Sequence, residues 1–234
     1  MAQHIGIVGC SAEGAALCYR TICLEGGALM GRHAHPQVSM HTHPLSEYER
    51  YFEADDWDGV ADLMLSSAEK VARAGADFIV CPDNTIHQAF DRVIERSPLP
   101  WLHIAEEVGA EAARRGYRRL ALLGTRLLME GPVYPPKLVA LGIEYLIPEP
   151  DERERIDRII FDELVDGKFT AESLRYFTGV IGRMKEQGCD AVVLGCTEIP
   201  LLVTPESSPL PTLDSTRLLA RAALRRAVGA EPAK

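Results

Sequence analysis

Residues 75–85 read Gly-Ala-Asp-Phe-Ile-Val-Cys-Pro-Asp-Asn-Thr, and residues 188–198 read Gly-Cys-Asp-Ala-Val-Val-Leu-Gly-Cys-Thr-Glu. The two stretches align without gaps: each has a glycine, an aspartate two residues later, a short apolar run, and polar residues after it. A second match, at nearly the same separation along the chain, pairs residues 4–10 with residues 119–125. Two such matches predict that the chain is built from two similar halves.

Short apolar runs alternate along the chain with longer stretches of helical periodicity. The expected strands are Ile5–Val8, Gln37–His41, Phe78–Cys81, Leu99–His103, Leu120–Leu123, Glu144–Ile147 and Ala191–Leu194. The expected helices are Ala12–Leu24, Trp57–Ala74, Ile104–Arg115, Val133–Leu141, Glu152–Leu164, Ala171–Gln187 and Thr216–Val228. Helices of this length between buried strands are typical of βαβ units and a parallel sheet.

The predicted fold class is therefore α/β, with two pseudo-symmetric, doubly wound, Rossmann-like halves. We expect one half to comprise residues 1–103 together with 208–234, with the last helix returning to it, and the other to comprise residues 104–207. Open parallel sheets bind ligands beyond the carboxyl ends of their strands. The active site is accordingly expected in a cleft between the halves.

Composition excludes several classes of partner. The chain of 234 residues carries 25 basic and 34 acidic side chains, a formal net charge of −9. Nucleic acid and anionic membranes select basic surfaces, so neither is expected as a partner. The apolar runs are too short to span a bilayer, and the N-terminus lacks the basic region of a signal peptide. We expect a cytoplasmic protein whose six cysteines are mostly reduced.

The repeat places Asp83 and Cys196 at equivalent positions, each shortly after an apolar strand. Two such side chains on opposite sides of a substrate suit removal of a proton from one face of a carbon and delivery to the other. Polar residues near the strand ends provide hydroxyl, amide and backbone donors suited to binding a carboxylate. These residues are Asn84, Thr85, Thr197, Ser11 and Thr125.

Five short motifs resemble the cofactor-independent aspartate/glutamate racemases, within the wider aspartate, glutamate and hydantoin racemase superfamily. The most specific is Leu-Gly-Cys-Thr-Glu-Ile at 194–199, and the others lie at 5–9, 84–87, 167–170 and 213–216. The resemblance implies racemisation of a dicarboxylic amino acid without a cofactor. In that family two cysteines, one in each half of the chain, share the acid/base work, and the resemblance also implies a homodimer. Cys196 matches the second cysteine.

The resemblance also implies roles for binding residues. Asn84, Thr85 and Thr197 would contact the substrate's carboxylate or amine, and Lys168 would engage its distal carboxylate.

Asp83 departs from the family pattern, because it stands where the first cysteine is expected. A carboxylate is a weaker base than a thiolate by about 6 kcal/mol, of which burial recovers a part. Three alternatives stay open: a racemase that uses Asp83 and Cys196, an isomerase or decarboxylase of a related dicarboxylate that uses Cys196 alone, and a non-catalytic binding relative. Cys81, two residues before Asp83, is a rival for the first acid/base.

Histidines gather at 33, 35, 41 and 43, but no carboxylate joins them at a recognised metal-ligand spacing, so no metal is expected. His87 is expected to stabilise the start of a helix, and Glu198 to cap a helix or orient its neighbours.

Overall fold

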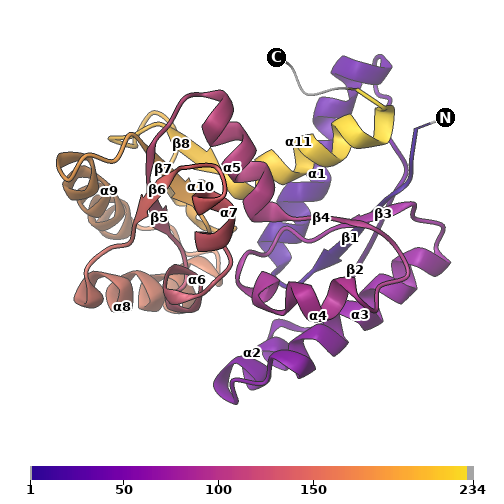
Figure 1. Ribbon diagram of the computed structural model, residues 1–234, viewed down its shortest axis with the longest axis horizontal. Helices are drawn as coiled ribbons and strands as arrows, with labels where there is room; N and C mark the ends of the chain where they lie inside the picture. Colours follow the sequence, from indigo (N-terminus) through magenta and orange to yellow (C-terminus); the bar gives the residue numbers. More distant parts are fainter. Residues whose placement is uncertain (1, 231–234) are drawn as a thin grey trace. The chain divides into compact units, whose positions relative to one another are not determined.

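The computed structural model describes residues 2–230, which divide into two compact units. One unit comprises residues 2–104 together with 216–230, and the other comprises residues 105–215. Each unit holds a four-stranded, all-parallel sheet with helices around it (Figure 1). The predicted α/β class with two doubly wound halves is confirmed.

The sheet of the first unit has the strand order β2-β1-β3-β4. Its strands are β1 (Ile5–Gly9), β2 (Val38–Thr42), β3 (Phe78–Val80) and β4 (Trp101–Leu102). Its helices are α1 (Ala12–Met30), α2 (Leu45–Glu53), α3 (Trp57–Arg73), the 3-10 helix η1 (Thr85–Ala89), α4 (Phe90–Ile94) and most of α11 (Ser215–Val228).

The sheet of the second unit has the order β6-β5-β7-β8, which repeats the topology of the first. Its strands are β5 (Arg119–Leu123), β6 (Glu144–Leu146), β7 (Ala191–Leu194) and β8 (Thr212–Asp214). Its helices are α5 (Ile104–Arg114), α6 (Arg126–Glu130), α7 (Pro135–Val139), α8 (Pro150–Ile159), the π-helix η2 (Ile160–Leu164), α9 (Ala171–Glu186) and α10 (Ile199–Leu202).

Apolar side chains cover both faces of the first sheet, as expected for parallel strands. On one face Val8 and Ile79 pack with side chains of α2 and α3, and on the other Ile5 and Ile7 pack with α1 and α11. In the second unit, α8, the π-helix and α9 cover one face through a single apolar cluster. The carboxyl edge of each sheet is therefore held on a rigid, packed support.

The internal repeat extends to the strand register. Ile7 lies opposite Val80 in the first sheet, and the aligned Leu122 lies opposite Val193 in the second. The repeated glycines, Gly75 and Gly188, both follow a helix with positive φ, +95° and +91°, a conformation that favours glycine.

The repeated aspartates hold equivalent strands in place. Asp77 Oδ2 accepts a hydrogen bond from His4 N at 2.7 Å, and Asp190 Oδ2 accepts one from Arg118 N at 2.7 Å. Both aspartates thereby fix the residue just before the first strand of their unit.

A further repeat, Ser-Pro-Leu-Pro, precedes the last strand of each sheet at 97–100 and 208–211. Ser97 Oγ donates to Leu99 O at 2.9 Å, and Ser208 Oγ donates to Leu210 O at 2.7 Å. Because β8 pairs with β7, residues 208–215 belong to the second unit. The predicted return to the first unit at residue 208 was therefore wrong, and the chain returns at residue 216.

Among residues 2–230, no helix has both the length and the apolar character needed to cross a membrane.

Candidate active site

Asp83 lies three residues beyond β3 and is 8% exposed. Its carboxylate accepts two backbone hydrogen bonds from the loop after β1: Cys10 N donates to Oδ2 at 2.9 Å and Ser11 N donates to Oδ1 at 3.1 Å. Donors of this kind favour the ionised carboxylate. Asp83 is therefore both a buried acidic group at the carboxyl edge of the sheet and an anchor for the β1–α1 loop.

A buried thiol lies beside Asp83: Cys81 Sγ donates to Asp83 O at 3.7 Å. Cys81 is fully buried, and burial, with the charge of Asp83 as a lesser cause, raises the pKa of its thiol well above the usual range. Burial likewise raises the pKa of Cys18, with Asp83 again contributing. A thiol that resists ionisation is a poor base, so the surroundings favour Asp83 over Cys81 as the acid/base of this unit.

His87 ties the end of β3 to the start of α5. Its Nδ1 is 2.8 Å from Asp83 O and its Nε2 is 3.5 Å from Ile104 N. A carbonyl only accepts, so Nδ1 carries the proton and Nε2 accepts from the amide. With its ring stacked on Phe90 at a centroid distance of 5.5 Å, His87 serves as a structural link.

Cys196 lies two residues beyond β7 and is partly exposed. Its Sγ donates a hydrogen bond to Glu198 Oε2 at 2.9 Å, and Glu198 is itself only 2% exposed. A carboxylate at this distance orients the sulfur by accepting its hydrogen bond. The sequence placed Glu198 beside the cysteine without assigning this contact, although its position within the specific Cys-Thr-Glu run was the signal for it.

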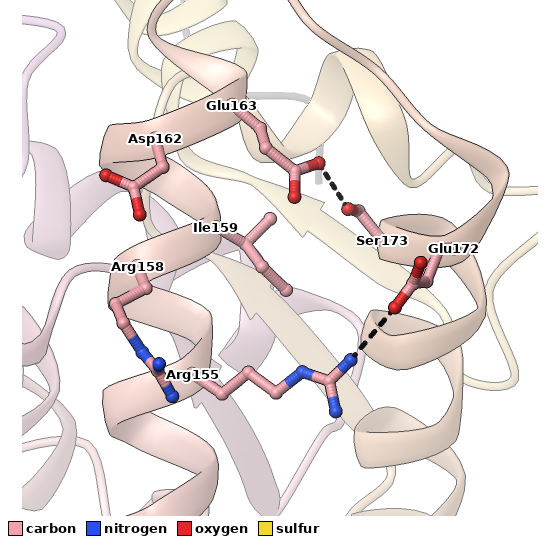
Figure 2. Close-up of a pocket in the computed structure, with 7 residues that line it drawn as sticks. All are labelled: Arg155, Arg158, Ile159, Asp162, Glu163, Glu172 and Ser173. Carbon is pink, nitrogen blue, oxygen red and sulfur yellow. Dashed lines mark hydrogen bonds and ion pairs between the residues drawn. The ribbon is translucent and has the colours of Figure 1, made fainter.

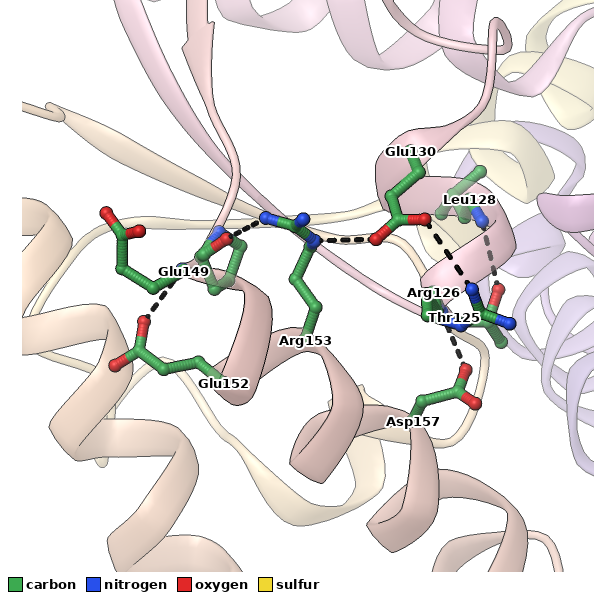
Figure 3. Close-up of polar contacts among 9 residues, drawn as sticks. Thr125, Arg126, Leu128, Glu130, Glu149, Glu152, Arg153 and Asp157 are labelled. Carbon is green, nitrogen blue, oxygen red and sulfur yellow. Dashed lines mark hydrogen bonds and ion pairs between the residues drawn. The ribbon is translucent and has the colours of Figure 1, made fainter.

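The loop after β5 is anchored differently from the loop after β1. Arg126 N, at the start of α6, donates to Asp157 Oδ1 of α8 at 2.6 Å (Figure 3). Arg153 of α8 reaches the same helix through Glu130 Oε1 at 2.8 Å, and Glu130 also pairs with Arg126. In the second unit a helix residue, Asp157, therefore accepts the N–H that is equivalent to the one of Ser11 accepted by Asp83.

The other predicted polar residues also lie at the two carboxyl edges. Ser11 and Thr125 are N-cap residues, accepting from Gly14 N at 3.1 Å and Leu128 N at 3.2 Å respectively. Asn84 and Thr197 are buried, each next to its acid/base candidate in sequence, while Thr85 is partly exposed as the first residue of η1. Asp83, Ser11, Asn84 and Thr85 thus gather in one unit, and Cys196, Thr125 and Thr197 belong to the other.

Lys168 lies in the connection between the π-helix and α9, outside any strand end. Its side chain is 61% exposed, and Nζ pairs with Asp166 Oδ2 at 2.9 Å. The hydrogen bond that Nζ donates to Asp166 raises the pKa of the amine, so Lys168 stays a cation.

A pocket of about 190 Å³ opens between α8, the π-helix and α9 (Figure 2). Some of its charged side chains are paired within the lining: Arg155 with Glu172 at 3.4 Å, and Glu163 with Ser173 Oγ at 2.5 Å. Neither Asp83 nor Cys196 lines it. The pocket is a feature of the helical layer and not of the strand ends.

Residues 2–230 hold no group of three or more histidines, cysteines or carboxylates placed to bind a metal ion. Of the clustered histidines, His41 bonds Ser67 Oγ at 2.9 Å and His43 bonds Ser66 Oγ at 3.2 Å.

Each of the two similar parallel-sheet units of this α/β protein carries, shortly beyond its third strand, a residue whose side chain can hold a proton, Asp83 in one and Cys196 in the other. The chain belongs to the Asp/Glu/hydantoin racemase family, which it matches over residues 7–223. The resemblance drawn from the Cys-Thr-Glu run is thereby confirmed, and the chain is an isomerase of the amino-acid racemase class.

Individual relatives agree with this assignment. A Yersinia pestis crystal structure described as a candidate Asp/Glu racemase is 32% identical, with a TM-score of 0.87 over 97% of this chain and 99% of that one. An aspartate racemase homologue from Pyrococcus horikoshii OT3 is 28% identical, with a TM-score of 0.80 over 96% and 99%. The broad-specificity amino-acid racemase RacX of Bacillus subtilis is 23% identical over 71% of each chain.

Proposed function

We propose that this chain is a cofactor-independent racemase of an acidic amino acid, aspartate or glutamate, with Asp83 and Cys196 acting on opposite faces of the substrate's Cα. The observation that carries the proposal is their equivalence. Each lies shortly beyond the third strand of its sheet, in units that share strand order and register. The proposal places the two carboxyl edges around one substrate.

The proposed reaction is a paired proton transfer. In one direction the Cys196 thiolate takes the proton from Cα, and the protonated carboxyl group of Asp83 gives its proton to the opposite face. In the other direction Asp83 is the base and the Cys196 thiol is the acid. The electron pair left on Cα moves into the substrate's α-carboxylate, where hydrogen-bond donors stabilise the developing charge. We assign these donors to Asn84, Thr85 and Thr197.

Glu198 supports the thiol in this scheme. Its carboxylate, 2.9 Å from Cys196 Sγ, holds the sulfur in one orientation and accepts its hydrogen bond. Ser11 and Thr125 would fix the ends of the helices beside the substrate, since both already cap α1 and α6.

The acidic substrate is assigned from Lys168, an exposed cation that would engage a distal carboxylate. Of the relatives, one is described as an aspartate racemase homologue and another as a broad-specificity amino-acid racemase. The test must therefore include amino acids that lack a distal carboxylate.

The decisive experiment follows loss of the Cα–H signal by NMR in D₂O. Each enantiomer of aspartate and glutamate is incubated with the enzyme, alongside alanine and lysine, and chiral chromatography reports the enantiomers. We expect exchange and inversion for at least one acidic pair, with Lys168→Ala raising KM for that pair more than for any neutral amino acid. Absence of exchange for both acidic amino acids would overturn the proposal.

A second candidate has one observation in its favour. Asp83 accepts two backbone hydrogen bonds and so serves the loop after β1 whether or not it moves a proton. A purely structural Asp83 would leave Cys196 as the single acid/base of an isomerase or decarboxylase of a related dicarboxylate. Conversion of maleate to fumarate, or release of CO₂ from a malonate, would support this candidate. Thermal stabilisation by a ligand without exchange or turnover would instead indicate a binding protein.

A further inference from the structure

Tyr48 of α2 is a buried polar group that the proposed reaction does not use. Its side chain is 0% exposed, and its hydroxyl has no hydrogen-bond partner among residues 2–230. A buried hydroxyl without a partner destabilises a protein, so each instance requires an explanation. Phenylalanine would fill the same space without that penalty.

The hydroxyl lies on the Asp83 side of the first sheet. Tyr48 packs in one cluster with Cys10 and Cys81, the residues that flank the Asp83 anchor in space and in sequence. Burial raises the pKa of Tyr48 far above its usual value, and Cys10, Cys81 and Asp83 raise it further. Tyr48 is therefore a neutral O–H donor at any physiological pH, and the ionised carboxylate near it is its strongest potential acceptor.

Ser67 is the other polar neighbour of Tyr48. It is fully buried, and its Oγ is engaged with His41 Nδ1 at 2.9 Å. His41 is partly exposed, and burial with the nearby Lys70 lowers its pKa. A structural pairing of Tyr48 with Ser67 is thus the competing explanation that an experiment has to separate.

We propose that Tyr48 is a positioning residue for Asp83, its buried hydroxyl donating toward the ionised carboxylate through one buried water. The hydroxyl adds a donor to the two backbone N–H groups that hold this side chain. The hydrogen bond of this hydroxyl favours the ionised form of Asp83, and it is lost when the carboxyl group is protonated. The inference deepens the proposed function, since it concerns how readily Asp83 exchanges its proton, but its central test needs no turnover.

The test compares wild type with Tyr48→Phe, and with Tyr51→Phe as the matched control on the same helix. The ¹³Cγ signal of Asp83, assigned by its loss in Asp83→Asn, is titrated by NMR. We expect the midpoint to rise by about half a pH unit or more in Tyr48→Phe, because the ionised form loses a donor. The Tyr51→Phe midpoint should stay at the wild-type value.

Where the enzyme is active, the acidic limb of kcat/KM should move to higher pH in the same variant. An unchanged Asp83 midpoint in Tyr48→Phe overturns the inference. A chain that shows no exchange but does show the midpoint shift would reject the proposed function and keep the role of Tyr48.

A second measurement serves if Tyr48→Phe folds poorly. With 3-fluorotyrosine incorporated, one ¹⁹F signal should follow the Asp83 titration in wild type and stop doing so in Asp83→Asn. If a buried tyrosine signal instead responds to Ser67→Ala and ignores Asp83→Asn, the hydroxyl serves Ser67, and the inference is wrong.

Discussion

The two units have the same strand order and register, yet the residue beyond the third strand is used differently in each. In the first unit Asp83 reaches across to the loop after β1 and accepts two of its N–H groups. In the second unit Asp157 of α8 accepts the corresponding N–H of Arg126 (Figure 3), and Cys196 donates to its near neighbour Glu198. The carboxylate of Asp83 thus supports a neighbouring loop, whereas the thiol of Cys196 is itself held by a carboxylate.

The surroundings of Asp83 and Cys196 differ as well. Asp83 is buried among thiols whose pKa values are raised by burial, while Cys196 is partly exposed beside a buried carboxylate. A cysteine at position 83 would be hard to ionise, because burial disfavours the thiolate. The carboxylate is a weaker base in general, but its two backbone donors favour its charged form.

The largest expected difference between the units is in catalysis. Cys196→Ser should lower kcat/KM by about 10²- to 10⁴-fold, because a serine hydroxyl ionises far less readily than a thiol and the acid–base contribution is lost. The melting temperature should change little, since the side chain is partly exposed and close in size. Exchange of the Cα proton in D₂O measures the effect. Cys23→Ser, which alters a partly buried thiol of α1, is the control and should retain wild-type activity. Near-normal exchange in Cys196→Ser would show that the two strand ends are not a catalytic pair.

The next difference is in stability. Asp83→Asn should lower the free energy of unfolding by about 1–3 kcal/mol, because the amide offers one acceptor oxygen to two buried N–H groups. Asp157→Asn should cost less, about 0.5–1 kcal/mol, since it weakens a single, more exposed contact that the amide oxygen can still accept. Urea denaturation measures both. Equal losses, or a larger loss for Asp157→Asn, would mean that the carboxylate at position 83 is not the stronger anchor.

The sequence predicted the parts of the fold that follow from local pattern. The run Ala191–Leu194 is β7 as expected, and Gly75 and Gly188 end their helices as expected. The repeated Ser-Pro-Leu-Pro was a visible signal for the last strand of each sheet, and its omission led to the misplaced return of the chain. Helix α2 was not predicted, because Pro44 and the histidines before it indicate an extended segment.

Contacts between distant residues were beyond the reach of sequence patterns. Nothing about Asp157 distinguishes it from the other acidic residues of α8 until the helix packs beside Arg126. The environment of Tyr48 likewise depends on how α2 packs over the sheet, which periodicity does not determine. The candidate acid/base pair could be found because it lies within the repeat, whereas its supporting residues lie outside it.

The smallest expected difference concerns the repeated aspartates, which test whether the two units are equivalent away from the site. Asp77 accepts one backbone bond from His4, whereas Asp190 accepts two, from Arg118 at 2.7 Å and Arg119 at 3.3 Å. Asp77→Asn and Asp190→Asn should each lower the free energy of unfolding by about 1 kcal/mol, with the larger loss for Asp190→Asn. Their effects should add in the double variant, because the two residues lie in different units and share no partner. Urea denaturation of the three variants measures this, and Glu69→Gln, at an exposed i,i+4 pair with Arg73, is the control. Marked non-additivity would show that the two sites are energetically coupled. An Asp77→Asn variant with unchanged stability would show that the two aspartates are not equivalent in energy, although the backbones around them are.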